Sequence, residues 1–99
     1  MGWARKYIEQ LEQGKQVQFR PRGNSMSGKI ESGQLVTVTP IGQKDIKVGN
    51  IVLCKVGRSD YLHLVKATLG NRFQIGNNQG RINGWTQRRN IYGLVIDVR

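Results

Sequence analysis

The chain has 99 residues, with 16 Lys and Arg against six Asp and Glu, which gives a formal net charge of +10. A chain of this length has room for one domain, residues 1–99, and this excludes multidomain architectures. Apolar residues make up 37% and charged residues 22%, a balance typical of a folded chain rather than a disordered one.

Several function classes are disfavoured at this point. No apolar stretch approaches the roughly 20 residues that a membrane-spanning helix needs, and no basic segment followed by an apolar run opens the chain. We therefore expect a cytoplasmic protein without a membrane partner. The single cysteine, Cys54, lies in the apolar run Ile51–Cys54, which predicts a buried structural thiol. We expect no metal and no other cofactor.

The positive charge suggests nucleic-acid binding, because Lys and Arg that neutralise phosphates release counterions. The basic residues are scattered along the sequence rather than clustered in blocks, so an ordinary solvated surface is the other interpretation. In the binding interpretation, bases stack on Trp85 or Tyr92. In the same interpretation, six residues contact the phosphate groups: Arg20, Arg22, Lys29, Arg81, Arg88 and Arg89.

A short helix is predicted within residues 1–14. Trp3, Tyr7, Ile8 and Leu11 recur at the spacing of one apolar helix face, and Gly14 is a typical helix stop. A helix this short is marginal alone, so its apolar face has to dock on the remaining chain or on a partner.

Residues 15–99 have the sequence pattern of a β domain, in which short apolar runs are separated by Gly, Asn, Asp and Pro. This pattern predicts a sandwich or barrel rather than alternating helices and strands. The expected strands are Val17–Arg20, Gln34–Thr39, Asn50–Val56, Tyr61–Lys66, Arg72–Ile75 and Ile91–Val98.

Four local patterns refine this prediction. Ile51–Leu53 is apolar at every position, which predicts a central strand, and Gly57–Asp60 is typical of a hairpin connection. In the last strand Leu94, Ile96 and Val98 alternate with Val95, Asp97 and Arg99, which predicts one buried and one solvent-exposed face. Residues 76–89, rich in Asn and Gly, are predicted to form a long surface loop.

One serine and the single histidine of the chain are candidates for nucleophilic catalysis. Ser25 lies in the turn Gly23–Met26, and His63 lies in the expected strand Tyr61–Lys66. A serine nucleophile needs a base that takes its proton near neutral pH, and histidine has an ordinary pKa near 6.5. Strand alternation places His63 on the face of Tyr61 and Val65 and Lys66 on the opposite face. Either His63 or Lys66 can serve Ser25, but not both.

In their order along the chain, these residues resemble the catalytic domain shared by LexA-type self-cleaving repressors and type I signal peptidases. The resemblance runs from about Val17 to the C-terminus and covers several short motifs. They are Gly23-Asn24-Ser25-Met26, Ile30 with Gly33-Gln34-Leu35-Val36, Val48-Gly49-Asn50-Ile51-Val52, His63-Leu64, Gly76-Asn77-Asn78 and Gly93-Leu94-Val95.

The resemblance implies a partly open barrel of short strands and an acyl-enzyme mechanism on a protein or peptide substrate. Ser25 is then the nucleophile, His63 the general base, and Ser25, Met26 and Asn77 form the oxyanion and substrate-binding site. The sequence departs from the family where Gln34, Asn50 and Asn77 replace aspartates. Asn77 stands where Ser-His members carry the aspartate that assists the histidine, so the same resemblance also implies an alternative, an inactive member that acts as a basic binding module.

Overall fold

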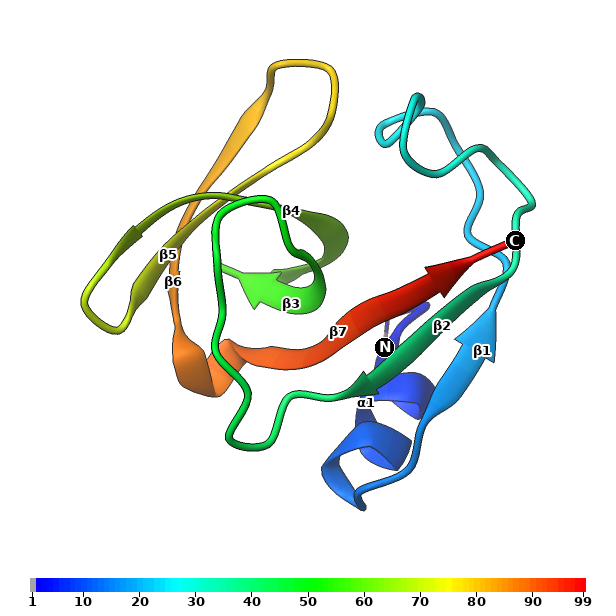
Figure 1. Ribbon diagram of the computed structural model, residues 1–99, viewed down its shortest axis with the longest axis horizontal. Coiled ribbons are helices and arrows are strands. Elements are labelled where there is room, and N and C mark those ends of the chain that lie inside the picture. Colours follow the sequence, from blue (N-terminus) through cyan, green and yellow to red (C-terminus); the bar gives the residue numbers. More distant parts are fainter. Residues whose placement is uncertain (1) are drawn as a thin grey trace.

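The computed structural model describes residues 2–99 and shows a mainly β fold with one short N-terminal helix, as the sequence pattern predicts (Figure 1). Helix α1 spans Arg5–Glu12, and a 3₁₀ turn, η1, spans Arg88–Asn90. The strands are β1 (Val17–Phe19), β2 (Val36–Pro40), β3 (Ile51–Val56), β4 (Ser59–Leu69), β5 (Arg72–Gly76), β6 (Ile82–Gln87) and β7 (Ile91–Val98).

The strands form one antiparallel sheet in the order β1-β2-β7-β3-β4-β5-β6. Strand β7 joins two halves of the sheet, because it pairs with β2 on one edge and with β3 on the other (Figure 1). The prediction that Ile51–Leu53 lies in a central strand is confirmed, since β3 pairs with both β7 and β4. The hairpin is also confirmed, with Val56 opposite Ser59 across Gly57 and Arg58.

Helix α1 ends where the sequence predicts. Gly14 has φ of 82°, a left-handed conformation that glycine adopts without a Cβ penalty. Leu11 is buried against the sheet, and Tyr7 and Ile8 pack on the same core. Within residues 2–99, no helix has both the length and the apolar character needed to cross a bilayer.

Two apolar cores form on opposite faces of β3. Leu53 belongs to the core that includes α1, β1 and β2, whereas its neighbours Val52 and Cys54 belong to a second core with residues of β4, β5 and β7. Successive side chains of a strand point to opposite faces, so an all-apolar strand can supply both cores at once. Cys54 is fully buried, as predicted, and burial raises the pKa of its thiol to about 12, with a smaller contribution from the charge of Asp60.

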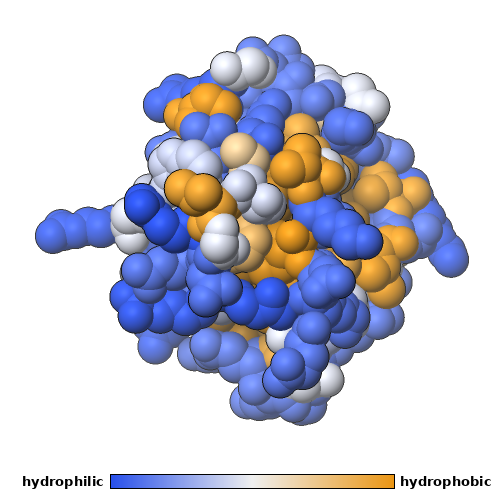
Figure 2. Space-filling model, turned by 60° about the vertical axis from the view of Figure 1, so that its left-hand side comes forward, coloured by the Kyte–Doolittle hydropathy of each residue, from blue (hydrophilic) through white to orange (hydrophobic). Residues whose placement is uncertain are grey.

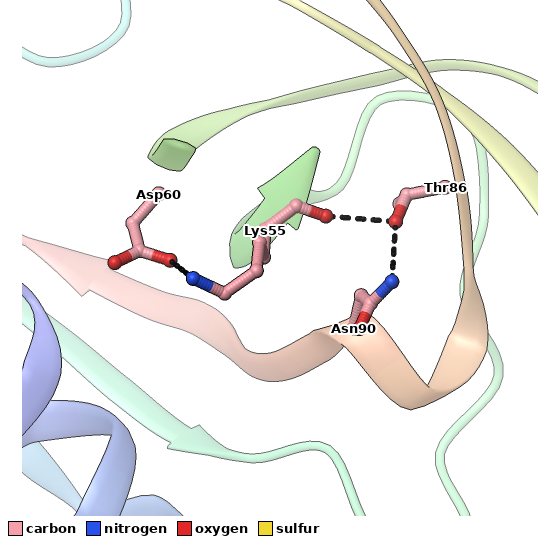
Figure 3. Close-up of polar contacts among 4 residues, drawn as sticks. All are labelled: Lys55, Asp60, Thr86 and Asn90. Atoms are coloured by element: carbon pink, nitrogen blue, oxygen red, sulfur yellow. Dashed lines mark hydrogen bonds and ion pairs between the residues drawn. The ribbon is translucent and has the colours of Figure 1, made fainter. Parts of the chain in front are cut away.

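Polar contacts fasten β6 and η1 to β3 (Figure 3). The Thr86 hydroxyl donates to the Lys55 carbonyl at 2.7 Å and accepts from the Asn90 amide at 3.2 Å. Lys55 also forms an ion pair with Asp60 across the β3–β4 hairpin, at 3.2 Å. The partly buried side chain of Asp60 is thereby held beside the groove described below.

Two expectations are wrong. Residues 76–89 are not one long loop, because Ile82–Gln87 forms strand β6 and pairs with β5. The sequence pattern hid this strand, since of its side chains only Thr86 is buried. The alternation in β7 also fails, since Ile96 is 54% exposed. This position lies in β7 beyond the segment that pairs with β3.

Most of the surface is hydrophilic, and hydrophobic side chains gather near the centre of the face shown in Figure 2. Large apolar side chains that remain exposed include Leu69 at the end of β4 and Ile82 and Trp85 in β6. The Arg72 guanidinium lies 5.8 Å from the Trp85 ring centroid, so this indole is partly covered by a cation–π contact.

We expect Leu53→Ala to lower the free energy of unfolding by about 2–5 kcal/mol. Truncation of the fully buried Leu53 side chain leaves a cavity in the first core, the one that includes α1, β1 and β2. The matched control Leu69→Ala makes the same chemical change at a side chain that is 66% exposed and should alter stability by no more than about 0.5 kcal/mol. Urea unfolding measures both. Equal effects would contradict this assignment of the core.

Candidate functional site

Ser25 lies at the start of a tight turn in the loop between β1 and β2. The Ser27 N–H donates to the Asn24 carbonyl at 3.2 Å, and the Ile30 N–H donates to the Met26 carbonyl at 2.8 Å. The side chains of Met26 and Ile30 are buried in the first core and anchor the turn. Ser25 itself is exposed, so its hydroxyl is presented to solvent from a fixed backbone.

A second loop, between β5 and β6, holds this turn from outside. The Asn78 N–H donates to the Ser25 carbonyl at 2.9 Å, and the Asn78 side-chain amide donates to the Ser27 carbonyl at 2.7 Å. A Cβ at Gly28 would lie 3.0 Å from the Asn78 amide nitrogen, so the glycine allows this close approach. Figure 1 shows the two loops beside each other at the top of the molecule.

His63 reaches Ser25 from strand β4. Its Nε2 atom lies 3.2 Å from the Ser25 hydroxyl oxygen, across a separation of 38 residues in the sequence. The Tyr61 ring stacks on the imidazole with centroids 5.0 Å apart, as strand alternation predicts. Of the two candidate bases, His63 therefore contacts Ser25, whereas the Lys66 side chain packs against Gly76.

The other ring nitrogen of His63 contacts Asn83 of strand β6. His63 Nδ1 and Asn83 Oδ1 are 2.7 Å apart. With this amide oxygen as acceptor, Nδ1 carries the imidazole proton, which leaves the Nε2 lone pair directed at the Ser25 hydroxyl. Sequence reasoning missed Asn83, because it lay in the segment interpreted as a loop.

Asn77 has a different place from the one implied by the resemblance. Its side-chain oxygen accepts from the Gln79 and Arg81 N–H groups at 2.8 and 2.9 Å. This buried amide therefore shapes the β5–β6 connection, while Asn83 makes the contact with His63. Met26 lines the groove beside Ser25, although most of its side chain is in the core.

Burial is the main influence on the proton affinity of His63. It lowers the pKa of the imidazole below its usual 6.5, the hydrogen bond with Asn83 acts in the opposite direction, and the charge of Lys66 lowers the pKa further. The net direction is downward, so the imidazole is neutral at pH 7 and able to accept a proton.

Ser25 and His63 open onto a groove of about 440 Å³. One wall is formed by Phe19, Arg20 and the residues up to Gly23, and the other by Asp60–His63 of β4. Trp3 and Tyr7 of the N-terminal segment border the same groove. A bound molecule could therefore touch the Ser25–His63 pair, α1 and both walls together.

The six basic residues assigned to phosphates are not gathered in one place. Arg20 and Arg22 lie on the groove, whereas Arg88 and Arg89 lie at η1, next to the segment Pro40–Gly42. The Arg88 guanidinium donates to the Gly42 and Lys44 carbonyls at 3.0 and 2.6 Å, and Arg20 donates to the Gly33 carbonyl at 2.8 Å. These hydrogen bonds fix loops. Lys29 and Arg81 are exposed in the two loops beside Ser25.

Within the described part of the chain, no three His, Cys, Asp or Glu side chains come together as a metal site would require. Comparisons with protein-family models, with curated proteins and with solved structures find no match for this chain.

We expect the stability of the protein to fall as the pH drops below about 6.5, because the unfolded chain then binds a proton that the folded state, with its lowered His63 pKa, takes up only at lower pH. His63 is the single histidine, so its imidazole gives one resolved titration by NMR. In His63→Gln, the melting temperature measured between about pH 5 and 8 should lose the part of its pH dependence that comes from His63. A His63 pKa above 6.5 would contradict the prediction.

Proposed function

We propose that this protein is a small serine peptidase with the architecture of the LexA and signal-peptidase catalytic domains, acting on an extended segment of another protein. The observation that carries the proposal is the chain of contacts Ser25–His63–Asn83 beside a groove, at 3.2 and 2.7 Å. Hydroxyl, base and a group that orients the base are the three parts of an activated serine nucleophile.

Each part has a distinct role in the proposed reaction. Ser25 Oγ attacks the carbonyl carbon of the scissile bond while its proton passes to His63 Nε2. The same nitrogen then gives this proton to the departing amine, which leaves an acyl group on Ser25. Water adds in the reverse sequence, with Nε2 as the base, and releases the acid product together with the free enzyme.

The negative charge that develops on the carbonyl oxygen needs hydrogen-bond donors. Within residues 2–99, the Ser25 and Met26 N–H groups donate to no backbone carbonyl, so both are available at the start of the turn. Asn78 fixes the orientation of the turn through the Ser25 and Ser27 carbonyls. We therefore assign the oxyanion site to Ser25 and Met26, and a positioning role to Asn78.

Unpaired strand edges support an extended peptide as the substrate. Strand β1 is at the edge of the sheet, and β4 pairs with β5 only from Leu64 onward. Within residues 2–99, the edge of Ser59–His63 that does not face β3 therefore has no strand partner. The last residue of β1, Phe19, and Asp60–His63 of β4 line the groove. A peptide bound there can form main-chain hydrogen bonds of the β-augmentation type and carry its carbonyl to Ser25.

A fluorophosphonate probe should acylate Ser25, because the probe reports on an activated serine hydroxyl. We expect His63→Ala to slow labelling by about 10²–10⁴-fold, with Ser27→Ala, a serine in the same turn, as the matched control. In the wild type, labelling should rise with pH through a midpoint below 6.5, following the lowered pKa of His63. Peptide mapping identifies the modified residue. Equal labelling of the His63→Ala protein would exclude the dyad.

Asn83→Asp should increase the labelling rate, because a carboxylate stabilises the imidazolium that forms when Ser25 loses its proton. Exchange of the corresponding carboxylate for an amide costs a Ser-His-Asp triad about 10⁴-fold, so we expect a gain of at least about tenfold here. The same substitution should raise the His63 pKa measured by NMR. Asn77→Asp is the control, since Asn77 does not contact the imidazole. A raised pKa without faster labelling would contradict the assigned role of Asn83.

A further inference from the structure

Aromatic side chains line the groove from its far end up to the imidazole. Trp3 and Phe19 lie with ring centroids 5.8 Å apart, and Tyr7 stacks on Phe19 at 4.4 Å. Nearer the nucleophile, Tyr61 stacks on His63. All five residues border the groove, together with the apolar side chains of Met26, Ile30 and Leu62. The indole of Trp3 is 51% exposed, so at this end the aromatic surface is open to a ligand.

The dimensions of the groove suit large side chains. An apolar cavity of about 150 Å³ is enough to hold a benzene molecule, and the groove has about 440 Å³. Side chains of an extended peptide alternate in direction, so residues two apart point to the same side. A small residue such as alanine would leave most of the aromatic surface in contact with water, whereas a phenylalanine or leucine side chain would cover it.

The charges around the groove favour an acidic peptide. Asp60 is already ion-paired with Lys55 at 3.2 Å, and the remaining carboxylate, Glu31, accepts from the Gly28 N–H at 2.7 Å. The basic residues that line the groove are Arg20 and Arg22, and neither forms an ion pair within residues 2–99. With Lys55, the ion-pair partner of Asp60, the groove has three cations (Arg20, Arg22 and Lys55) against two carboxylates, and the whole chain carries +10, so negatively charged peptides are attracted.

We propose that the groove selects acidic peptide segments that place a bulky apolar or aromatic side chain close to the scissile bond. This inference rests on the proposed peptidase function and adds its substrate class. Trp3, Tyr7 and Phe19 supply the apolar surface, and Arg22 supplies the charge that distinguishes acidic from basic peptides. An extended backbone beside β4 carries both features at once.

The test measures binding separately from cleavage. The full-length Ser25→Ala protein is titrated, by fluorescence anisotropy, into labelled peptides of the form Ser-Xaa-Ser-Glu-Ser-Glu-Ser with blocked ends. We expect the peptide with Phe at Xaa to bind at least about tenfold more tightly than the peptide with Ala, since single apolar groups in a pocket discriminate by about 10–200-fold. Replacing both Glu by Lys should weaken binding, and the preference for Glu should shrink as salt screens the charges.

Matched variants assign these effects to the groove. In the same protein, Trp3→Ala should reduce the preference for Phe over Ala at least threefold or so, while Trp85→Ala, at an exposed tryptophan that does not line the groove, leaves it unchanged. Arg22→Gln should reduce the preference for Glu over Lys. Arg89→Gln, which removes an equal charge near η1, serves as its control.

The outcomes separate this inference from the proposed function. Suppose that the Ser25→Ala protein shows a Phe preference that depends on Trp3, while the fluorophosphonate fails to label the wild type. That result would support the groove assignment and exclude the peptidase. Labelling of Ser25 together with equal binding of the Phe and Ala peptides would keep the peptidase and overturn the substrate class. Failure of all the peptides to bind, or a loss of preference in Trp85→Ala as large as in Trp3→Ala, would also overturn it.

Discussion

The connection between β5 and β6 holds the two halves of the candidate site together. At its start, Asn78 binds the Ser25 and Ser27 carbonyls, and beyond it, in β6, Asn83 binds the His63 imidazole. Asn77 shapes the turn between them through the Gln79 and Arg81 N–H groups. The distance from Ser25 to His63 therefore depends on one short loop, which links a turn of the first core to a strand at the other end of the sheet.

This dependence gives the contacts that hold β6 a role in the candidate site. Strand β6 is an edge strand, and edge strands paired on one side only are weakly held. The Thr86–Lys55 hydrogen bond fastens β6 to β3 at a further point. This hydrogen bond and the pairing with β5 hold the strand that carries Asn83, the partner of His63 Nδ1.

The amide at position 83 and the buried imidazole form a consistent electrostatic arrangement. A buried histidine without a carboxylate partner stays neutral at pH 7, which suits a base in its resting state. In the proposed reaction the cost would fall on the imidazolium, because an amide oxygen stabilises a positive charge less than a carboxylate does. Such a site is expected to turn over slowly, and the positive surroundings of the groove add to this by disfavouring the imidazolium.

The sequence by itself determined the fold class, the helix before Gly14, the central strand Ile51–Leu53 and the candidates Ser25 and His63. Each of these depends on local periodicity or on the chemistry of one side chain, which neighbouring residues reveal. Only the tertiary structure decided that His63 rather than Lys66 meets Ser25, that Asn83 rather than Asn77 meets His63, and that Ile82–Gln87 is a strand. These results depend on contacts between residues far apart in the chain, such as the 38 residues between Ser25 and His63. In β6 the strand is formed by pairing with β5, and since only one of its side chains is buried, local apolar periodicity carried no signal of it.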